Sequence, residues 1–226
     1  MNLAFNAARV DSFILLAGDD LLVAETLPMR VAAVAGEGPR IAQCRYRSFS
    51  DTHPERAGVD FPRSGRRHHP AGGAVSFNRS FAERYFPIPE RLPNEDTWLR
   101  AVVLGCDLQV QFIDRLGLRY RIHPGNAMGP LHGFVKMNLK LRQRHAAFTI
   151  AMEHFADEAR SPSWQRLAAL ARAESLRAAG RWGQLLLLKG LEPGDRMIML
   201  ANSTACLFGL KKALLGATGR LCAYLS

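Results

Sequence analysis

The stretch FILLAGDDLL, Phe13–Leu22, decides how the rest of the chain is interpreted. Its first half belongs to the uninterrupted apolar run SFILLA, residues 12–17, which predicts a strand buried on both faces of a sheet. The segment LAFNAAR, residues 3–9, comes just before it and predicts a short helix. Two adjacent acids, Asp19 and Asp20, follow the apolar run. In open α/β sheets ligands collect beyond the carboxyl ends of the strands, so these acids lie where a binding site is expected.

The composition is that of a globular chain with an excess of positive charge. Of 226 residues, 48% are hydrophobic and 22% are charged, which suffices for a sizeable core, and the formal net charge is +10. This balance favours an anionic partner, namely nucleic acid, an acidic membrane face or phosphorylated small molecules. An arginine-rich surface explains the same balance equally well.

The sequence predicts a cytoplasmic protein. Its four cysteines are scattered and form no CxxC pair, so neither a disulfide framework nor a thiolate metal site is expected, and reduced thiols fit the cytoplasm. The start MNLAFNAAR lacks the basic residues and apolar run of a signal peptide. No uncharged apolar stretch reaches the roughly 18 residues that a membrane span needs.

The hydrophobic pattern divides the chain into an α/β region, residues 1–130, and a helical, basic region, residues 131–226. Within the first region, residues 47–70 are polar and rich in proline and glycine, which predicts a long loop. The remaining elements follow from their periodicity: a strand in AVSFN (74–78), a helix from Asn94 to Gly105 and a strand in LQVQFID (108–114).

Three short motifs in the first region carry candidate chemistry. Paired carboxylates such as Asp19 and Asp20 suit a hard divalent cation, because Mg²⁺ or Mn²⁺ is typically held by one or two carboxylates and the oxygens of a diphosphate. The alternative is an ordinary surface turn, since Gly-Asp-Asp is favourable turn chemistry. The NED motif, residues 94–96, offers a general base, although acids in the first turn of a helix are also stabilised by its dipole.

The third motif is YRIHPGN, Tyr120–Asn126. Arg121 and His123 alternate, so on one strand their side chains point the same way. Arginine suits a phosphate fork, and a neutral histidine suits a metal or a phosphate oxygen. The alternative is a surface loop with ordinary polar groups.

Together, the ordered set FILLAGDD, GGAVSFNRS, NEDTWLR and YRIHPGNAM resembles the family 2 glycosyltransferases, over roughly residues 2–128. The resemblance implies a partial GT-A (Rossmann-like) mixed sheet with flanking helices, followed by a helical C-terminal extension. In the family's D-x-D-D pattern the first acid stands where this chain has Ala17. The chain starts at the helix before the acidic strand, so most of the N-terminal nucleotide-binding half is expected to be missing.

The resemblance also implies a reaction. An inverting glycosyltransferase, hexosyltransferase-like, would move a sugar from a nucleotide-sugar donor, such as a UDP-sugar, to a saccharide or lipid-linked acceptor in the synthesis of cell-surface or extracellular polysaccharide. Asp19 and Asp20 would hold Mg²⁺ or Mn²⁺ on the diphosphate.

The other site residues receive their roles from the same resemblance. Asp96 would take the proton of the acceptor hydroxyl group, with Glu95 as helper or substitute. Arg121 and His123 would hold the diphosphate or close the site over it.

Two other functions remain open from the sequence. In the first, the chain is a truncated, non-catalytic remnant of this family. In the second, it is a basic protein that binds a membrane or nucleic acid. Nucleic acid is not expected as a partner, because the Trp and Tyr residues are dispersed without interleaved basic residues. Lys211 and Lys212 lie between apolar segments, which predicts a peripheral contact with the inner face of the membrane or, alternatively, a helical subdomain with solvated lysines.

Overall fold

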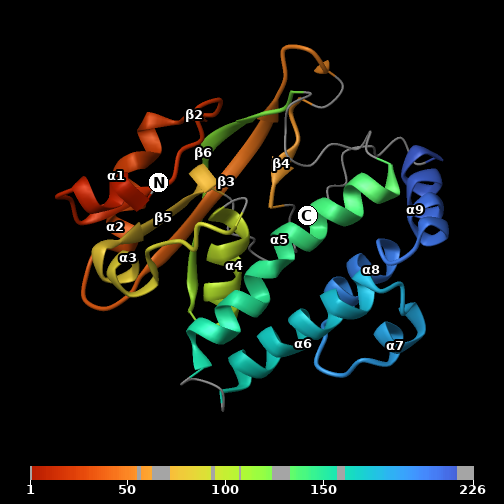
Figure 1. Ribbon diagram of the computed structural model, residues 1–226. Coiled ribbons are helices and arrows are strands. Elements are labelled where there is room, and N and C mark those ends of the chain that lie inside the picture. Colours follow the sequence, from red (N-terminus) through yellow and green to blue (C-terminus); the bar gives the residue numbers. More distant parts are fainter. Residues whose placement is uncertain are drawn as a thin grey trace. The chain divides into compact units, whose positions relative to one another are not determined.

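A computed structural model describes residues 2–54, 57–62, 72–92, 95–106, 108–123, 133–156 and 161–217 (Figure 1). The chain divides into two compact units. Unit 1 comprises Met1–Val103 and Asp107–Pro124, and unit 2 comprises Leu104–Cys106 and Gly125–Ser226. The boundary predicted between residues 130 and 131 lies in the segment 124–132, which is outside the described residues.

Unit 1 is built on a mixed sheet in which the long strands β3 and β6 run side by side (Figure 1). The strand order is β1-β5-β3-β6-β2, and β4 pairs with β3. The β3–β6 pair is parallel, and the other described pairs are antiparallel. The predicted α/β class with a mixed sheet is confirmed. The strands are β1 (Ser12–Ile14), β2 (Leu21–Leu22), β3 (Ile41–Phe49), β4 (Asp60–Phe61), β5 (Val75–Asn78) and β6 (Val110–Arg121).

Four α-helices of the described part of unit 1 flank the sheet: α1 (Asn2–Ala7), α2 (Leu27–Val34), α3 (Arg79–Tyr85) and α4 (Glu95–Gly105). Helix α2 packs on β3, β5 and β6. Its Arg30 is fully buried and donates two 2.8 Å hydrogen bonds from Nη2, to the carbonyl oxygens of Gly73 and Val75. This guanidinium therefore fixes the chain between η3 (Gly72–Ala74) and β5, directly beside the candidate site.

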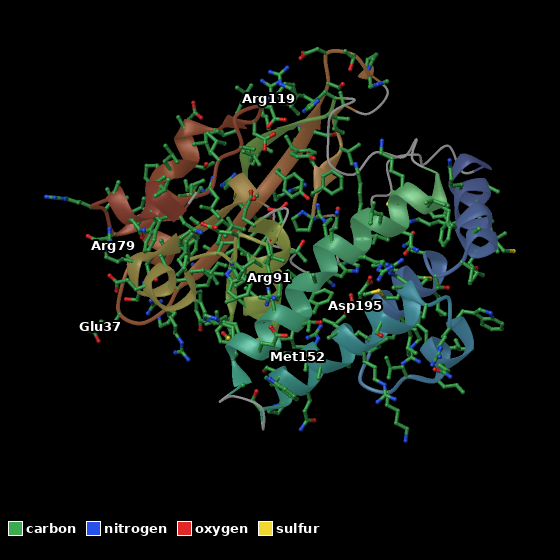
Figure 2. The ribbon with its side chains drawn as sticks, in the orientation of Figure 1. Glu37, Arg79, Arg91, Arg119, Met152 and Asp195 are labelled. Carbon is green, nitrogen blue, oxygen red and sulfur yellow. The ribbon has the colours of Figure 1, made fainter. Side chains whose placement is uncertain are left out.

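An aromatic cluster attaches α1 and β1 to the rest of unit 1. Phe13 of β1 stacks on Phe77 of β5 with ring centroids 5.7 Å apart, and Phe5 of α1 lies 5.4 Å from Phe13. Arg79, labelled in Figure 2, lies over the Phe13 ring at 5.2 Å and donates to the carbonyl oxygen of Ala8. These contacts hold in place the strand that precedes the turn with the two acids.

The prediction that SFILLA is a strand buried on both faces is wrong in two respects. The strand is limited to Ser12–Ile14, and all three residues are half-buried. Leu15 is buried beyond its end, whereas Leu16 is 44% exposed. The physical reason is position, because β1 lies at one end of the strand order and pairs only with β5.

The predicted loop over 47–70 is also wrong at both of its described ends. Residues 47–49 complete β3, and Asp60–Phe61 form β4, which pairs with it. A bidentate ion pair joins Arg47 to Asp60, with Nε–Oδ1 at 2.5 Å and Nη2–Oδ2 at 2.9 Å. Tyr46 stacks on Phe61 at 4.9 Å. A two-residue strand held by cross-strand side-chain pairs has little signature in hydrophobicity alone. Residues 63–71 are outside the described part of the chain.

Unit 2 is helical in its described residues. A buried contact between His145 Nδ1 of α5 and Glu174 Oε2 of α6, at 2.7 Å, joins these two helices. Ser161 caps α6, because its side chain accepts a hydrogen bond from the Trp164 amide at 3.0 Å. Within the described part of the chain, no helix is both long and apolar enough to cross a membrane. The helices are α5 (Phe134–His154), α6 (Pro162–Ala178), α7 (Trp182–Leu187), α8 (Pro193–Ala201) and α9 (Ala205–Ala217).

Candidate functional site

The two adjacent acids lie in a turn that reverses the chain between β1 and β2. The amide of Asp20 donates to the carbonyl oxygen of Ala17 at 3.3 Å, which closes the turn. Strand β2 then pairs antiparallel with the end of β6, with Leu21 opposite Arg119. The acids are therefore set beside the last residues of β6.

Arg121 ends β6 and fixes this acidic turn. Its backbone amide donates to Asp20 Oδ1 at 2.9 Å, and its Nε donates to the carbonyl oxygen of Asp19 at 3.0 Å. Its guanidinium lies over the Phe49 ring at 4.5 Å and also contacts the Asp51 carboxylate. Arg121 thus holds the backbone of the acids in place, and its charge is shared with Asp51.

His123 contacts the first acid directly. Its Nε2 lies 2.8 Å from Asp19 Oδ2, and the two side chains are 38% and 42% exposed. The histidine lies beyond β6, which ends at Arg121, so strand alternation does not orient it. Instead, the Ile122 amide donates to the Phe49 carbonyl at 2.8 Å, and Ser50 Oγ donates to the Ile122 carbonyl at 2.6 Å. The loop after β3 positions His123.

The second pair of acids approaches the same end of unit 1 from α4. Asp96 Oδ1 accepts a 2.5 Å hydrogen bond from the Gly72 amide. A Cβ atom added at Gly72 would lie 3.3 Å from Asp96 Oδ1, 3.6 Å from Glu95 Oε1 and 3.6 Å from the carbonyl oxygen of Leu15. Both acids of α4 therefore lie close to the segment that follows β1. Asn94, the first residue of the predicted helix, lies outside the described residues.

Electrostatics also link the two acid pairs. Burial chiefly, together with the neighbouring carboxylates of Asp19 and Asp96, raises the pKa of Asp20 to about 6, against the hydrogen bond and the charge of Arg121, which lower it. Like charges that disfavour one another in this way indicate a site suited to a proton or a cation.

Tyr46, which the sequence analysis did not single out, lies within electrostatic range of both acid pairs. Burial chiefly, and then Asp96, Tyr120 and Asp20, raise the pKa of Tyr46 above its ordinary value, so the phenol keeps its proton. No sequence motif marks this residue. The signal that could have found it is the alternation through RYRSF, residues 45–49, of which only residues 47–49 fall in the predicted loop.

The six residues expected in the site thus lie at one end of unit 1. Asp19 contacts His123, Asp20 is bonded to Arg121 and interacts with Asp96, and Glu95 and Asp96 share Gly72 as a neighbour. Among the described residues, no group of three or more His, Cys, Asp and Glu side chains is arranged to hold a metal ion.

Comparison of the chain with protein-family models, with curated proteins and with solved structures finds no match in any of the three.

Proposed function

We propose that this chain is a glycosyltransferase of family 2 type that moves a sugar from a nucleotide-sugar donor to an acceptor hydroxyl group, with inversion. One observation carries the proposal: the Asp19–Asp20 turn and the Asp96 carboxylate of α4 are close enough for their charges to interact. The acids that hold the metal ion on the diphosphate and the general base act on the same sugar, so they must lie close together. The α/β sheet that bears the acidic turn supports the further proposal that unit 1 is a partial GT-A fold.

The donor atoms fit a divalent cation that also binds a diphosphate. Asp19 and Asp20 each accept one hydrogen bond through one carboxylate oxygen, from His123 and from the Arg121 amide. Within the described part of the chain, no further hydrogen bond reaches either carboxylate. Two carboxylates are the usual protein contribution to Mg²⁺ held beside substrate phosphates. When bound, the ion would neutralise charge on the departing nucleoside diphosphate.

The chain's own residues would orient the reactants. Arg121 fixes both acids through its amide and Nε, so the acid pair is preorganised before the donor binds. His123, at 2.8 Å from Asp19, is placed to exchange that contact for an oxygen of the diphosphate.

Asp96 would act as the general base. The Gly72 amide holds its Oδ1, which fixes the direction in which the carboxylate meets an acceptor hydroxyl group. The acceptor oxygen forms the new bond to the anomeric carbon as the bond to the diphosphate breaks, and Asp96 takes the hydroxyl proton. Glu95, next in the chain and also near Gly72, is the alternative proton acceptor.

Calorimetry with UDP and Mn²⁺ tests the proposal. Wild-type protein should bind UDP only with the metal, and Asp19→Ala should abolish that binding. Asp96→Asn should keep UDP binding but lower sugar transfer to water or to an added saccharide about 10²–10⁴-fold. Asp11→Ala is the matched control, because the Asp11 side chain is fully exposed on unit 1. Absence of UDP binding by the wild-type protein at any metal concentration would support the non-catalytic alternative.

A membrane contact by unit 2 is a second proposal, which a specific surface favours. On α5, Val135 is 82% exposed and Leu139 is 57% exposed, one helical turn apart. Partial burial, followed by repulsion from Lys136 and Arg144, lowers the pKa of Lys140, so cations crowd beside these apolar side chains. An apolar surface with adjacent cations suits an anionic lipid face. The wild-type protein should sediment with phosphatidylglycerol vesicles and only weakly with phosphatidylcholine vesicles, and Val135→Asp should lose the sedimentation with phosphatidylglycerol. Unchanged sedimentation of Val135→Asp with phosphatidylglycerol, or equal sedimentation of the wild type with both lipids, would refute the proposal.

A further inference from the structure

Three aromatic rings lie on adjacent strands next to the acids. Tyr46 of β3 stands directly opposite Phe61 of β4, with ring centroids 4.9 Å apart and nearly parallel. On the other side, the ring of Tyr120 on β6 meets Tyr46 edge-on at 6.1 Å. Tyr46 is thus clamped between two rings, and its orientation is fixed by packing rather than by a hydrogen bond.

The hydroxyl group of Tyr46 is the unused polar group of this arrangement. Within the described part of the chain it makes no hydrogen bond, whereas Asp96 and Asp20 both act on it electrostatically. The neighbouring rings of Phe61 and Tyr120 fix the Tyr46 ring and thereby the direction of its hydroxyl group. A rigid phenol within electrostatic range of Asp20 and Asp96 is a hydrogen-bond donor for an oxygen atom that reaches these acids.

The order of the strands sets where that oxygen would lie. Asp20 immediately precedes β2, β6 comes next, and Tyr46 is on β3, two strand spacings away. Neighbouring strands are about 4.8 Å apart, so Tyr46 lies roughly 10 Å across the sheet from β2. That separation exceeds the width of one sugar ring. Tyr46 therefore lies beyond the donor sugar if the diphosphate is held at Asp19 and Asp20.

We infer that Tyr46 is a binding residue for the acceptor saccharide, whose ring oxygen or hydroxyl group accepts the phenolic hydrogen bond beside Asp96. The inference rests on the proposed function, which places the diphosphate at the Asp19–Asp20 turn and the base at Asp96. Because the incoming oxygen attacks from the side opposite the leaving group, the acceptor must lie on the β3 side of the donor sugar. Tyr46, Phe61 and Tyr120 form the apolar edge of that region, and a saccharide matches it with its own C–H and O–H groups.

Saturation-transfer NMR titration of the full chain tests the inference. The probes are methyl β-D-glucopyranoside, methyl β-D-galactopyranoside and the methyl β-glycoside of N-acetylglucosamine, each with and without UDP and Mn²⁺. The variant Tyr46→Phe removes one oxygen atom and keeps the ring stack. Loss of one hydrogen bond should weaken binding of the preferred glycoside about 3- to 10-fold. Tyr85→Phe, in a buried tyrosine of α3, controls for loss of a phenol elsewhere in unit 1.

The expected result is weaker glycoside binding in Tyr46→Phe alone, with the same affinity for UDP and Mn²⁺ in all three proteins. Equal glycoside affinity in wild type and Tyr46→Phe would overturn the inference. A wild-type protein that binds UDP and Mn²⁺ but none of the glycosides would also overturn it. A loss of UDP affinity in Tyr46→Phe would overturn it too, because it would place the tyrosine on the donor side. If the wild type binds no UDP, the proposed function fails, and the titration without UDP still decides whether Tyr46 holds a saccharide.

Discussion

Each unit contains a buried acid among other charged side chains, and the two surroundings shift the pKa of that acid in opposite directions. In unit 2, Glu174 accepts hydrogen bonds of 2.7 Å from Arg177 Nε, from Arg177 Nη2 and from His145 Nδ1. Burial alone would favour the neutral acid, but these bonds outweigh it and lower the pKa of Glu174. Arg177 is fully buried and also donates to Asn138 Oδ1 and to the Asn202 carbonyl oxygen.

In unit 1 the balance is reversed. Asp20 is buried and accepts one hydrogen bond, from the Arg121 amide, while the charges of Asp19 and Asp96 disfavour its ionised form and the charge of Arg121 favours it. The unit 2 group is satisfied internally, so its charges stabilise packing. In the unit 1 group, burial and the carboxylates of Asp19 and Asp96 disfavour the ionised form of Asp20, which is a cost to folding that a bound cation would relieve. Opposite effects of pH and mutation should therefore distinguish the two.

The largest expected effect is loss of the cation in unit 2. Arg177→Met should lower the free energy of unfolding by about 3–5 kcal/mol, because it leaves Glu174 and the Asn202 carbonyl buried with fewer partners. Urea denaturation followed by circular dichroism measures it. Arg172→Met, on the exposed side of the same helix, should change stability by less than about 0.5 kcal/mol. Similar losses of unfolding free energy in the two variants would show that the buried contacts of Arg177 do not stabilise the fold.

The next effect is the free-energy cost of ionising Asp20 in the folded protein. The pKa of Asp20 is raised from 3.8 to about 6, so the folded state holds this proton more tightly than the unfolded state does. The cost is absent below pH 3.8, grows between pH 3.8 and 6 and is complete above pH 6. Asp20→Asn should therefore stabilise the metal-free protein above pH 6, by up to about 3 kcal/mol, and change little at pH 3.5.

Denaturation at several pH values with EDTA present measures this difference. Asp11→Asn, in a fully exposed side chain, should show no such profile. A stability gain in Asp20→Asn that is equal at pH 3.5 and pH 8 would mean that charge is not its cause.

Glu174 should show the opposite sign of pH dependence. Its folded-state pKa lies below the ordinary value of 4.5, so its contribution is complete above pH 4.5 and is lost as the pH falls through the folded-state value. Glu174→Gln should cost about 1.5–3 kcal/mol at pH 7, the range for hydrogen bonds to a charged group, and less in acid. Parallel pH profiles for Glu174→Gln and Asp20→Asn would remove the contrast between the two groups.

The sequence predicted the acids of unit 1 better than the strands that carry them. The predicted acidic turn at Asp19 and Asp20 is confirmed, because Gly-Asp-Asp is a local signal, whereas the strand expected to end directly before it ends at Ile14. The extent of that strand was not predictable, since it depends on the strand having only β5 as a partner. Likewise β4 depends on Arg47, Asp60 and the Tyr46–Phe61 stack, which are cross-strand contacts between residues far apart in sequence.

The candidate site shows the same limit. Arg121 and His123 were picked out by a motif, but the groups that orient them, Asp51 and Ser50, belong to no motif and reach them only through the β3–β6 pairing. Tyr46 was missed for the same reason. Helices of unit 2 were easier, because the apolar spacing that predicts α5 and α6 is contained within each helix.

The smallest expected effect belongs to the exposed contact at the edge of the acidic site. His123→Gln removes a contact with Asp19 in which the two side chains are 38% and 42% exposed, and such exposed contacts contribute at most about 1 kcal/mol. The free energy of unfolding should therefore change by less than that amount. If His123 serves the donor diphosphate, as proposed, the same variant should weaken UDP binding in the presence of Mn²⁺ well beyond its effect on stability. A variant that loses stability but keeps its affinity for UDP would instead make His123 a structural partner of Asp19, and the acidic turn would then resemble the internally satisfied group of unit 2.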